Sequence, residues 1–285
     1  MKIIRQIEVF APDYLGKMDV LIAGGKILAV EEQLEGGYEG VEVEELSGEG
    51  KVLTPGFIDC HFHILGGGGE GGYQNRTPEV TLSQLTTAGV TTVVGCLGTD
   101  GEGRDMTALI SKAKGLEAEG ISTYVYEGSY RLPVKTVTDS IIKDFLTIDK
   151  IIGIGEIAVS DHRSSQPSFE EFARAAADAR VGGMLSGKAG IINVHLGGGK
   201  RKLELLTRIV EETEIPITQF LPTHANRTPE LFEACVAFAK RGGTIDFTAS
   251  EDPDFWEKTD GEVRFSKALK RLIEEDVSLD NFTMT

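Results

Sequence analysis

The segment TPGFIDCHFH, residues 54–63, decides the fold class because it joins an apolar run to two closely spaced histidines. His61 and His63 stand two residues apart, which places both imidazoles on one face of an extended strand, roughly 7 Å apart along the backbone. Two imidazoles on one face can converge on one metal ion. The alternative is that the two histidines bind no metal and simply form hydrogen bonds near the end of a strand.

Outward from this segment, short apolar runs alternate with segments of helical period. Eight runs predict strands, at residues 52–60, 90–97, 122–130, 151–159, 190–195, 217–222, 243–250 and 281–285. Seven helix candidates lie between them, with predicted starts at Thr77-Pro78-Glu79, Ser168 and Thr228-Pro229. Repeated βα units imply a parallel sheet. We therefore predict an α/β protein with a (β/α)8 TIM-type barrel, and a doubly wound open sheet is the alternative.

The first 50 residues follow a different pattern. Residues 20–30 hold two β-rich runs around Gly24-Gly25, which is a hairpin signal. We predict two domains: residues 1–50, the N-terminal part of a small β-sandwich domain, and residues 51–285, the barrel. A barrel of this type needs about 250 residues. Because the last predicted strand begins at Asn281, we expect the barrel to be truncated at strand 8 and the chain to be a fragment.

Composition excludes several classes of function. The chain has 29 Lys and Arg against 45 Asp and Glu, a net charge of −16, so it lacks the basic surface that nucleic acids and anionic membranes attract. It contains no long apolar run and no signal peptide, which predicts a cytoplasmic protein. Cys60, Cys96 and Cys235 lie in apolar segments and are expected to be buried, reduced thiols.

The histidines point to a metal site. Four of the five follow predicted strands: His61, His63, His195 and His224. In a barrel the carboxyl ends of the strands meet at one rim, where catalytic groups gather. Glu156 lies in an otherwise apolar strand, and burying it costs several kcal/mol unless it is paired, protonated or metal-bound. These donors predict a site for one or two ions of zinc or another divalent metal. The alternative for Glu156 is that a neighbouring Arg or Lys neutralises its charge.

Several motifs extend this interpretation. Residues 54–63 resemble the first-strand signature of the amidohydrolase superfamily of metal-dependent hydrolases. Within it the chain resembles the isoaspartyl dipeptidase (β-aspartyl peptidase) family, through residues 65–72, 76–80, 98–100, 160–164, 221–227 and 240–246. The motifs are long and occur in the family's order along the whole chain.

The resemblance implies a binuclear zinc site. It implies that His61 and His63 hold the more buried zinc ion and that His195 and His224 hold the second. Glu156 takes the bridging position, where the best-known family pattern has a carbamylated lysine. The nearest lysine, Lys150, precedes the strand, so we expect Glu156 to be the bridge.

The resemblance also implies a substrate site for a small dipeptide. Glu70 would receive the substrate α-amino group, Tyr130 would polarise the scissile carbonyl, and Arg163 and Arg227 would hold the two carboxylates. Gly68 and Thr99 would add backbone or hydroxyl contacts. Two guanidiniums and one carboxylate complement a β-aspartyl dipeptide in charge and number. The alternatives are a surface salt bridge for either arginine and a packed aromatic for Tyr130.

The implied reaction is hydrolysis of the amide formed by an aspartate side chain, with two metal ions lowering the pKa of a shared water. In the family the general base is an aspartate just after strand eight, so we expect it to be missing from these 285 residues and their activity to be weak. The family also implies an octamer. Alternative functions are another amidohydrolase, such as a cyclic amidase or an N-acyl amino-acid deacylase, and a catalytically silent metal-binding subunit.

Overall fold

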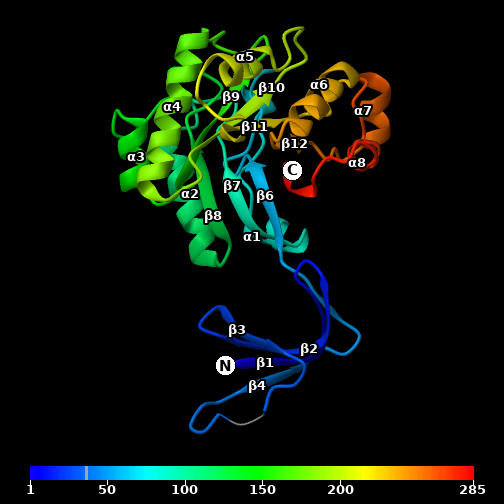
Figure 1. Cartoon of the computed structure of the whole chain (residues 1–285). Coiled ribbons are helices and arrows are strands. Elements are labelled where there is room, and N and C mark those ends of the chain that lie inside the picture. The colour runs from blue at the N-terminus through cyan, green and yellow to red at the C-terminus, as the bar shows by residue number, and fades with distance from the viewer. Residues whose placement is uncertain (36–37) are drawn as a thin grey trace. The chain divides into compact units, whose positions relative to one another are not determined.

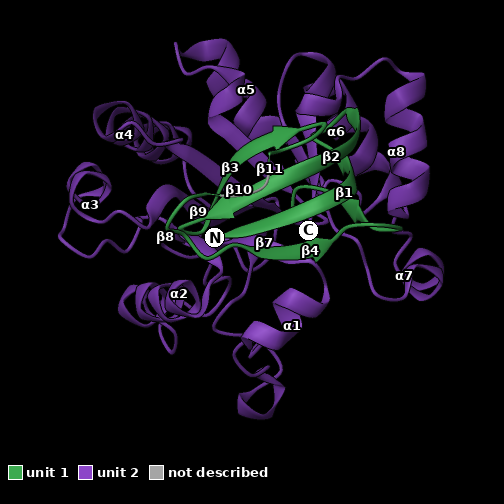
Figure 2. Cartoon of the chain, turned by 90° about the horizontal axis from the view of Figure 1, so that it is seen from below, with its two compact units in different colours: residues 1–57 green, residues 58–285 purple. Residues whose placement is uncertain are grey.

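The structure is a computed structural model of the chain, and it describes residues 1–35 and 38–285. It divides into two compact units, Met1–Phe57 and Ile58–Thr285, which Figure 2 shows in different colours. Each unit has its own apolar core, and the two are described separately.

The first unit is a small twisted β-sheet. Its strands are β1 (Lys2–Phe10), β2 (Tyr14–Ala23), β3 (Lys26–Glu31), β4 (Glu44–Ser47) and β5 (Val52–Leu53). The order is β3-β2-β1-β4, and β5 also pairs with β1. Gly24 and Gly25 have φ angles of 57° and 71°, the left-handed conformation that a two-residue hairpin turn requires. This confirms the predicted hairpin.

The second unit contains the barrel strands. These are β6 (Phe57–Phe62), β7 (Val90–Gly95), β8 (Ser122–Glu127), β9 (Ile151–Val159), β10 (Ile191–Leu196), β11 (Phe220–Thr223), β12 (Ile245–Phe247) and β13 (Phe282–Met284). Strands β6 to β11 lie side by side in chain order, and β12 pairs in parallel with β13. The predicted strands are therefore all present, although several bounds differ.

Side chains across the sheet distinguish the barrel from the open sheet. The Cys60 sulfur in β6 lies 3.6 Å from Asp246 Oδ1 in β12 and 3.6 Å from Thr283 Oγ1 in β13, so the first and last strands meet. A doubly wound sheet would also reverse its strand order, whereas β6 to β11 keep theirs. The prediction of a TIM-type barrel is confirmed, with the eighth strand ending at Met284 (Figure 1).

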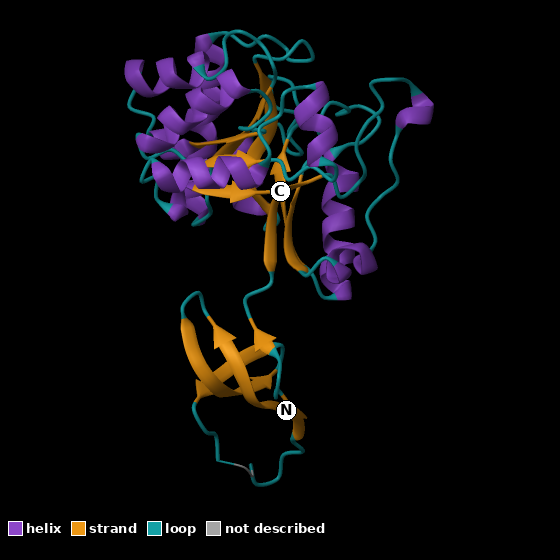
Figure 3. Cartoon of the chain, turned by 90° about the vertical axis from the view of Figure 1, so that its right-hand side faces the viewer, coloured by secondary structure: helices purple, strands orange, loops and turns teal. Residues whose placement is uncertain are grey.

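Helices cover the outside of the barrel strands, as Figure 3 shows. They are α1 (Leu82–Thr87), α2 (Met106–Glu119), α3 (Ile141–Thr147), α4 (Phe169–Ser186), α5 (Glu204–Glu212), α6 (Pro229–Lys240), α7 (Pro253–Thr259) and α8 (Phe265–Glu274). Short 3₁₀ turns occupy Tyr73–Asn75, Ile217–Gln219 and Leu279–Asn281. Among the described residues, no helix is long and apolar enough to cross a membrane.

The helix starts follow the predicted caps in two of three cases. Ser168 and Thr228 each accept a hydrogen bond from the backbone three residues on, so α4 and α6 begin where predicted. The first helix instead begins at Leu82, capped by Thr81. The prediction of a start at Thr77 is wrong because Thr77 is held in a loop, where its hydroxyl accepts a hydrogen bond from the Gly67 amide at 2.7 Å.

The predicted strand at 52–60 is two strands rather than one. Val52 and Leu53 form β5, which pairs with Glu8 and Val9 of β1, and β6 begins only at Phe57. Thr54-Pro55-Gly56 separates them, because proline lacks the N–H that a continuous ladder needs.

Candidate metal centre and substrate pocket

The predicted metal ligands converge at the carboxyl ends of four barrel strands. His61 lies in β6 and His63 directly follows that strand, while His195 lies in β10 and His224 follows β11. The rim position results from the parallel strand order, because every strand delivers its last residues to the same end of the barrel.

Glu156 of β9 lies at the centre of the histidines and is fully buried. Its Oε2 lies 2.9 Å from His61 Nε2, 3.1 Å from His195 Nδ1 and 3.9 Å from His224 Nε2. Its Oε1 lies 3.3 Å from His63 Nε2. One carboxylate therefore faces four imidazoles, with one oxygen toward His63 and the other toward the remaining three.

Charge interactions set the protonation of this cluster. Burial raises the pKa of Glu156, but His61, His195 and His63 more than offset it and hold that pKa well below its ordinary value. Burial together with His195 and His61 holds the pKa of His224 well below 6.5. Glu156 is thus ionised and His224 neutral at pH 7, as metal coordination requires. Burial lowers the pKa of His61, but Glu156 more than offsets it and raises that pKa well above 6.5, and Cys96 raises the pKa of His63 to about 9. These two imidazoles would therefore release a proton when a metal ion binds.

The donor atoms fit divalent metal ions. Two groups have their candidate ligand atoms within 4.8 Å of one another, one formed by His61, His63, Cys96 and Glu156 and the other by Glu156, His195 and His224. His61 Nε2 is buried and lies 2.9 Å from Glu156 Oε2, but the angle between them does not suit a hydrogen bond. This nitrogen therefore has no hydrogen-bond partner in the described part of the chain. A buried imidazole nitrogen without a partner is costly unless a ligand satisfies it, and a metal ion would do so.

Cys96 was not among the predicted site residues. It directly follows β7, is fully buried, and places its sulfur 3.6 Å from His63 Nδ1 and 4.0 Å from Glu156 Oε1. Lys150, in contrast, lies away from this cluster, where its amino group bonds to Glu117 and to the Thr123 carbonyl.

Three predicted substrate residues bond to one another. Glu70 Oε1 accepts a hydrogen bond from Arg163 Nη1 at 2.9 Å and from the Thr99 hydroxyl at 2.8 Å. The Arg163 guanidinium also lies over the Tyr130 ring, 5.1 Å from its centroid. The two side chains of opposite charge that were predicted to hold opposite ends of a substrate are therefore paired with each other in this structure.

Tyr130 connects the substrate residues to the metal ligands. Its hydroxyl lies 2.8 Å from His195 Nδ1. Burial and the charge of Glu156 raise the pKa of Tyr130, so the phenol keeps its proton at neutral pH. It can therefore donate a hydrogen bond at the rim of the barrel.

Asp161 is a second residue that the sequence did not single out. Its side chain is buried and bonds Arg163 through both oxygens, at 3.0 Å to Nε and 2.8 Å to Nη2. Asp161 Oδ2 also lies 3.1 Å from His195 Nε2. Burial raises the pKa of Asp161, but the bonds to His195 and Arg163 hold it far below its ordinary value. One ionised carboxylate thus orients a candidate metal ligand and a candidate substrate ligand.

The two remaining predicted residues also lie at this rim. Arg227 is half-buried and donates from Nε to the Leu196 carbonyl at 3.0 Å. Gly68 has a φ of 72°, and a Cβ there would lie 2.3 Å from the Asn75 carbonyl oxygen, so the loop requires glycine. A hollow of about 450 Å³ opens beside it, lined in part by Gly68, Glu70 and Thr99.

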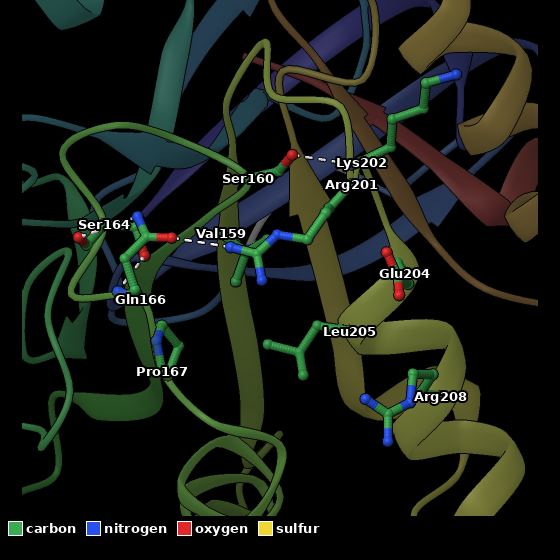
Figure 4. Close-up of a pocket in the computed structure, with 10 residues that line it drawn as sticks. All are labelled: Val159, Ser160, Ser164, Gln166, Pro167, Arg201, Lys202, Glu204, Leu205 and Arg208. Atoms are coloured by element: carbon green, nitrogen blue, oxygen red, sulfur yellow. Dashed lines mark hydrogen bonds between the residues drawn. The ribbon is translucent and has the colours of Figure 1, made fainter.

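A second hollow lies beside the ends of β9 and β10 and is drawn in Figure 4. It measures only about 60 Å³, and its wall includes Ser160, Gln166 and Arg201. Arg201 Nη2 bonds Gln166 Oε1 at 2.8 Å, so this cation is already partnered. None of the predicted site residues lines this hollow.

Comparisons with known proteins place the chain in a family. No family profile matches it. Among curated proteins, the imidazolonepropionase of Chromobacterium violaceum is 32% identical over 117 residues, which cover 40% of this chain and 28% of that protein. The imidazolonepropionase of Ectopseudomonas mendocina is 28% identical over 120 residues, covering 41% of this chain and 30% of that protein. The matched segment therefore spans less than a third of either relative.

Solved structures match the whole chain. A beta-aspartyl dipeptidase from Fervidobacterium islandicum AW-1, crystallised with a beta-Asp-Leu dipeptide, is 51% identical with a TM-score of 0.92, covering 100% of this chain and 72% of that one. A second crystal structure of that dipeptidase gives 51% identity, a TM-score of 0.93 and coverage of 100% and 75%. The D-hydantoinase from Thermus sp. shares the fold at 15% identity and a TM-score of 0.56, over 87% of this chain and 57% of that one.

The barrel and its rim cluster define a hydrolase of the amidohydrolase superfamily, the class to which these neighbours belong. At 51% identity over its full length, the chain belongs to the beta-aspartyl dipeptidase family of that superfamily.

Proposed function

We propose that the protein hydrolyses β-aspartyl (isoaspartyl) dipeptides with the help of two divalent metal ions, which we take to be zinc. The observation that carries this proposal is the position of Glu156, whose two oxygens face four imidazoles. A single fully buried carboxylate among four histidines fits a bridging ligand set better than a structural ion pair.

In this proposal His61 and His63 would hold the more buried ion, His195 and His224 would hold the second, and Glu156 would be a ligand shared by the two. When bound, such ions lower the pKa of a shared water toward about 7 and so make hydroxide available at neutral pH. Because Glu156 carries its own carboxylate, no carbamylated lysine is needed at the bridge.

The substrate groups of the proposal complement a dipeptide that carries two carboxylates and one ammonium. Arg163 and Arg227 would hold the carboxylates, and Glu70 would accept the α-amino group. Thr99 and Gly68 would contribute hydroxyl and backbone contacts. Since Arg163 and Glu70 are paired with each other at 2.9 Å, substrate binding would exchange that ion pair for two new ones.

Tyr130 would act on the scissile carbonyl. Its raised pKa keeps the phenol protonated, so it can donate a hydrogen bond to the oxygen as negative charge develops there. By the family resemblance, the general base would be an aspartate just after the eighth strand. We further propose, from the family resemblance, a cytoplasmic enzyme that assembles as an octamer.

Elemental analysis of the purified chain tests the metal site. The unmodified chain should carry up to two equivalents of metal, and Glu156→Gln should carry one or fewer. Glu127→Gln is the matched control, because Glu127 is also a fully buried barrel carboxyl but lies outside the cluster. Equal metal content in the unmodified chain and Glu156→Gln would remove Glu156 from the bridge.

Calorimetric binding of β-aspartyl-leucine tests the substrate class. Arg227→Met should weaken binding at least tenfold and leave the metal content unchanged. A cyclic amide and an N-acetyl amino acid serve as competing ligands. Binding of either in preference to β-aspartyl-leucine would favour the other amidohydrolase activities.

A further inference from the structure

The two donor groups around Glu156 are unequal in number. The inner group has four candidate ligands, namely His61, His63, Cys96 and Glu156. The outer group has three, and it shares Glu156 with the inner group while adding His195 and His224. The difference is Cys96, which the family resemblance did not assign to any role.

The candidate donors around Cys96 lie close together, with one donor atom each of Cys96, His61, His63 and Glu156 within 4.8 Å of the others. For bonds of about 2.3 Å to sulfur and about 2.0 Å to nitrogen or oxygen, tetrahedral coordination separates the ligand atoms by roughly 3.3–3.6 Å. The Cys96 sulfur lies 3.6 Å from one nitrogen of His63 and 4.0 Å from Glu156 Oε1. Glu156 in turn lies 3.3 Å from the other His63 nitrogen and 2.9 Å from His61 Nε2. Since only one nitrogen of His63 can bind a given ion, the side chain of His63 or of Cys96 would adjust for these donors to meet at one centre.

A second observation points to a ligand at the same place. The side chain of His61 is 4% exposed, and its Nε2 has no hydrogen-bond partner among residues 1–35 and 38–285. This nitrogen lies 2.9 Å from Glu156 Oε2, inside the group that contains Cys96. The cluster thus combines a buried thiol with a buried imidazole nitrogen that lacks a partner, and a cation would satisfy both.

We propose that Cys96 is a thiolate ligand of the inner metal site, which then has four protein donors where the outer site has three. This rests on the proposed function, which supplies the metal ions. The inner ion would then be held by a softer and more numerous donor set than the outer ion.

The proposal has two chemical consequences. Coordination by Cys96 breaks the S–H bond, and the proton passes to the solvent as the ion binds. A thiolate also makes the inner site favour zinc and other soft metals over magnesium or manganese. The outer site, with imidazole and carboxylate donors only, should exchange its ion more readily because it has one protein ligand fewer.

Cobalt substitution of the purified 285-residue chain tests the assignment. Cobalt bound to a thiolate gives a charge-transfer band in the near ultraviolet, which cobalt bound to nitrogen and oxygen alone lacks. We expect this band in the unmodified chain, its loss in Cys96→Ser, and its retention in Cys235→Ser, a variant of a thiol that is also fully buried but lies in α6. Metal content should fall from two equivalents to about one in Cys96→Ser only.

The outcomes separate the two proposals. A chain that loads two equivalents of cobalt without the band, or a band that survives in Cys96→Ser, overturns the role of Cys96 and leaves the proposed function standing. A chain that binds no metal overturns both. If Cys96→Ser does not fold, as judged by circular dichroism, the spectrum of the unmodified chain still decides the question, because Cys60 is the remaining thiol of the barrel strands and Cys60→Ser shows whether it is the source.

Discussion

Replacing Glu127 with glutamine should stabilise the barrel in a strongly pH-dependent way. Glu127 ends β8 and is fully buried, and neither of its carboxyl oxygens has a hydrogen-bond partner in the described ranges. Asp144 lies next to it and accepts hydrogen bonds from the amides of Val137 and Thr138 at 2.6 and 3.2 Å. Burial and the proximity of Asp144 raise the pKa of Glu127 to about 10.

The size of the effect follows from linkage. A carboxyl whose pKa is raised on folding contributes stability that is fully present below its unfolded pKa of 4.5 and is lost as the pH rises toward 10. At pH 7 the folded protein must hold Glu127 protonated, which costs about 3 kcal/mol at 1.36 kcal/mol per pH unit. Glutamine is neutral at every pH and avoids this cost. Glu127→Gln should therefore gain about 3 kcal/mol of stability at pH 7 and about 1 kcal/mol at pH 5.

Urea unfolding at pH 5, 6 and 7 measures the gain. The chain has one tryptophan, Trp256 in α7, so its fluorescence reports on the barrel unit alone. Glu119→Gln is the control, because Glu119 is exposed at the end of α2 and should change stability by less than about 0.5 kcal/mol. A constant difference between Glu127→Gln and the unmodified chain across the pH series would refute the reasoning.

Three further predictions concern the site and the core. Asp161→Asn should weaken metal binding about 10- to 100-fold, because Asp161 orients His195, and unchanged affinity in a chelator competition would contradict this. Arg163→Lys should raise the dissociation constant of β-aspartyl-leucine at least tenfold, since lysine cannot make a bidentate contact; calorimetry with an equal constant would argue against it. Phe172→Ala should cost about 3–5 kcal/mol in urea unfolding, whereas the half-exposed Phe255→Ala should cost far less.

The sequence was sufficient to predict the barrel and the centre of its site. Alternating apolar runs and helical segments mark all eight barrel strands, because a parallel sheet buries each strand on both faces. Four histidines at equivalent positions in the repeat converge in the structure, since parallel strands share one rim. The choice of Glu70, Thr99 and Arg163 as candidate substrate ligands depended instead on a family resemblance, and their hydrogen bonds to one another were not predicted.

Other features could not be read from the chain. Cys96 follows an apolar strand and is indistinguishable in sequence from a buried structural thiol until the curvature of the sheet brings it to His63. Asp161 begins a polar loop, where a carboxylate is ordinarily solvated. The start of the first helix was missed because Thr77 bonds to Gly67, a contact between loop segments that no helical propensity encodes.

If Glu70 and Arg163 hold the substrate as proposed, the ion pair between them would let the pocket reject incomplete ligands. A molecule that brings only a carboxylate must displace Glu70 and leaves an anion without a cation, and a molecule that brings only an amine leaves Arg163 without this partner. Only a zwitterion of the right span compensates both losses at once. Selectivity for the substrate would thus depend on the energetic penalty for ligands that pair with only one of the two residues, as much as on attraction to the substrate itself.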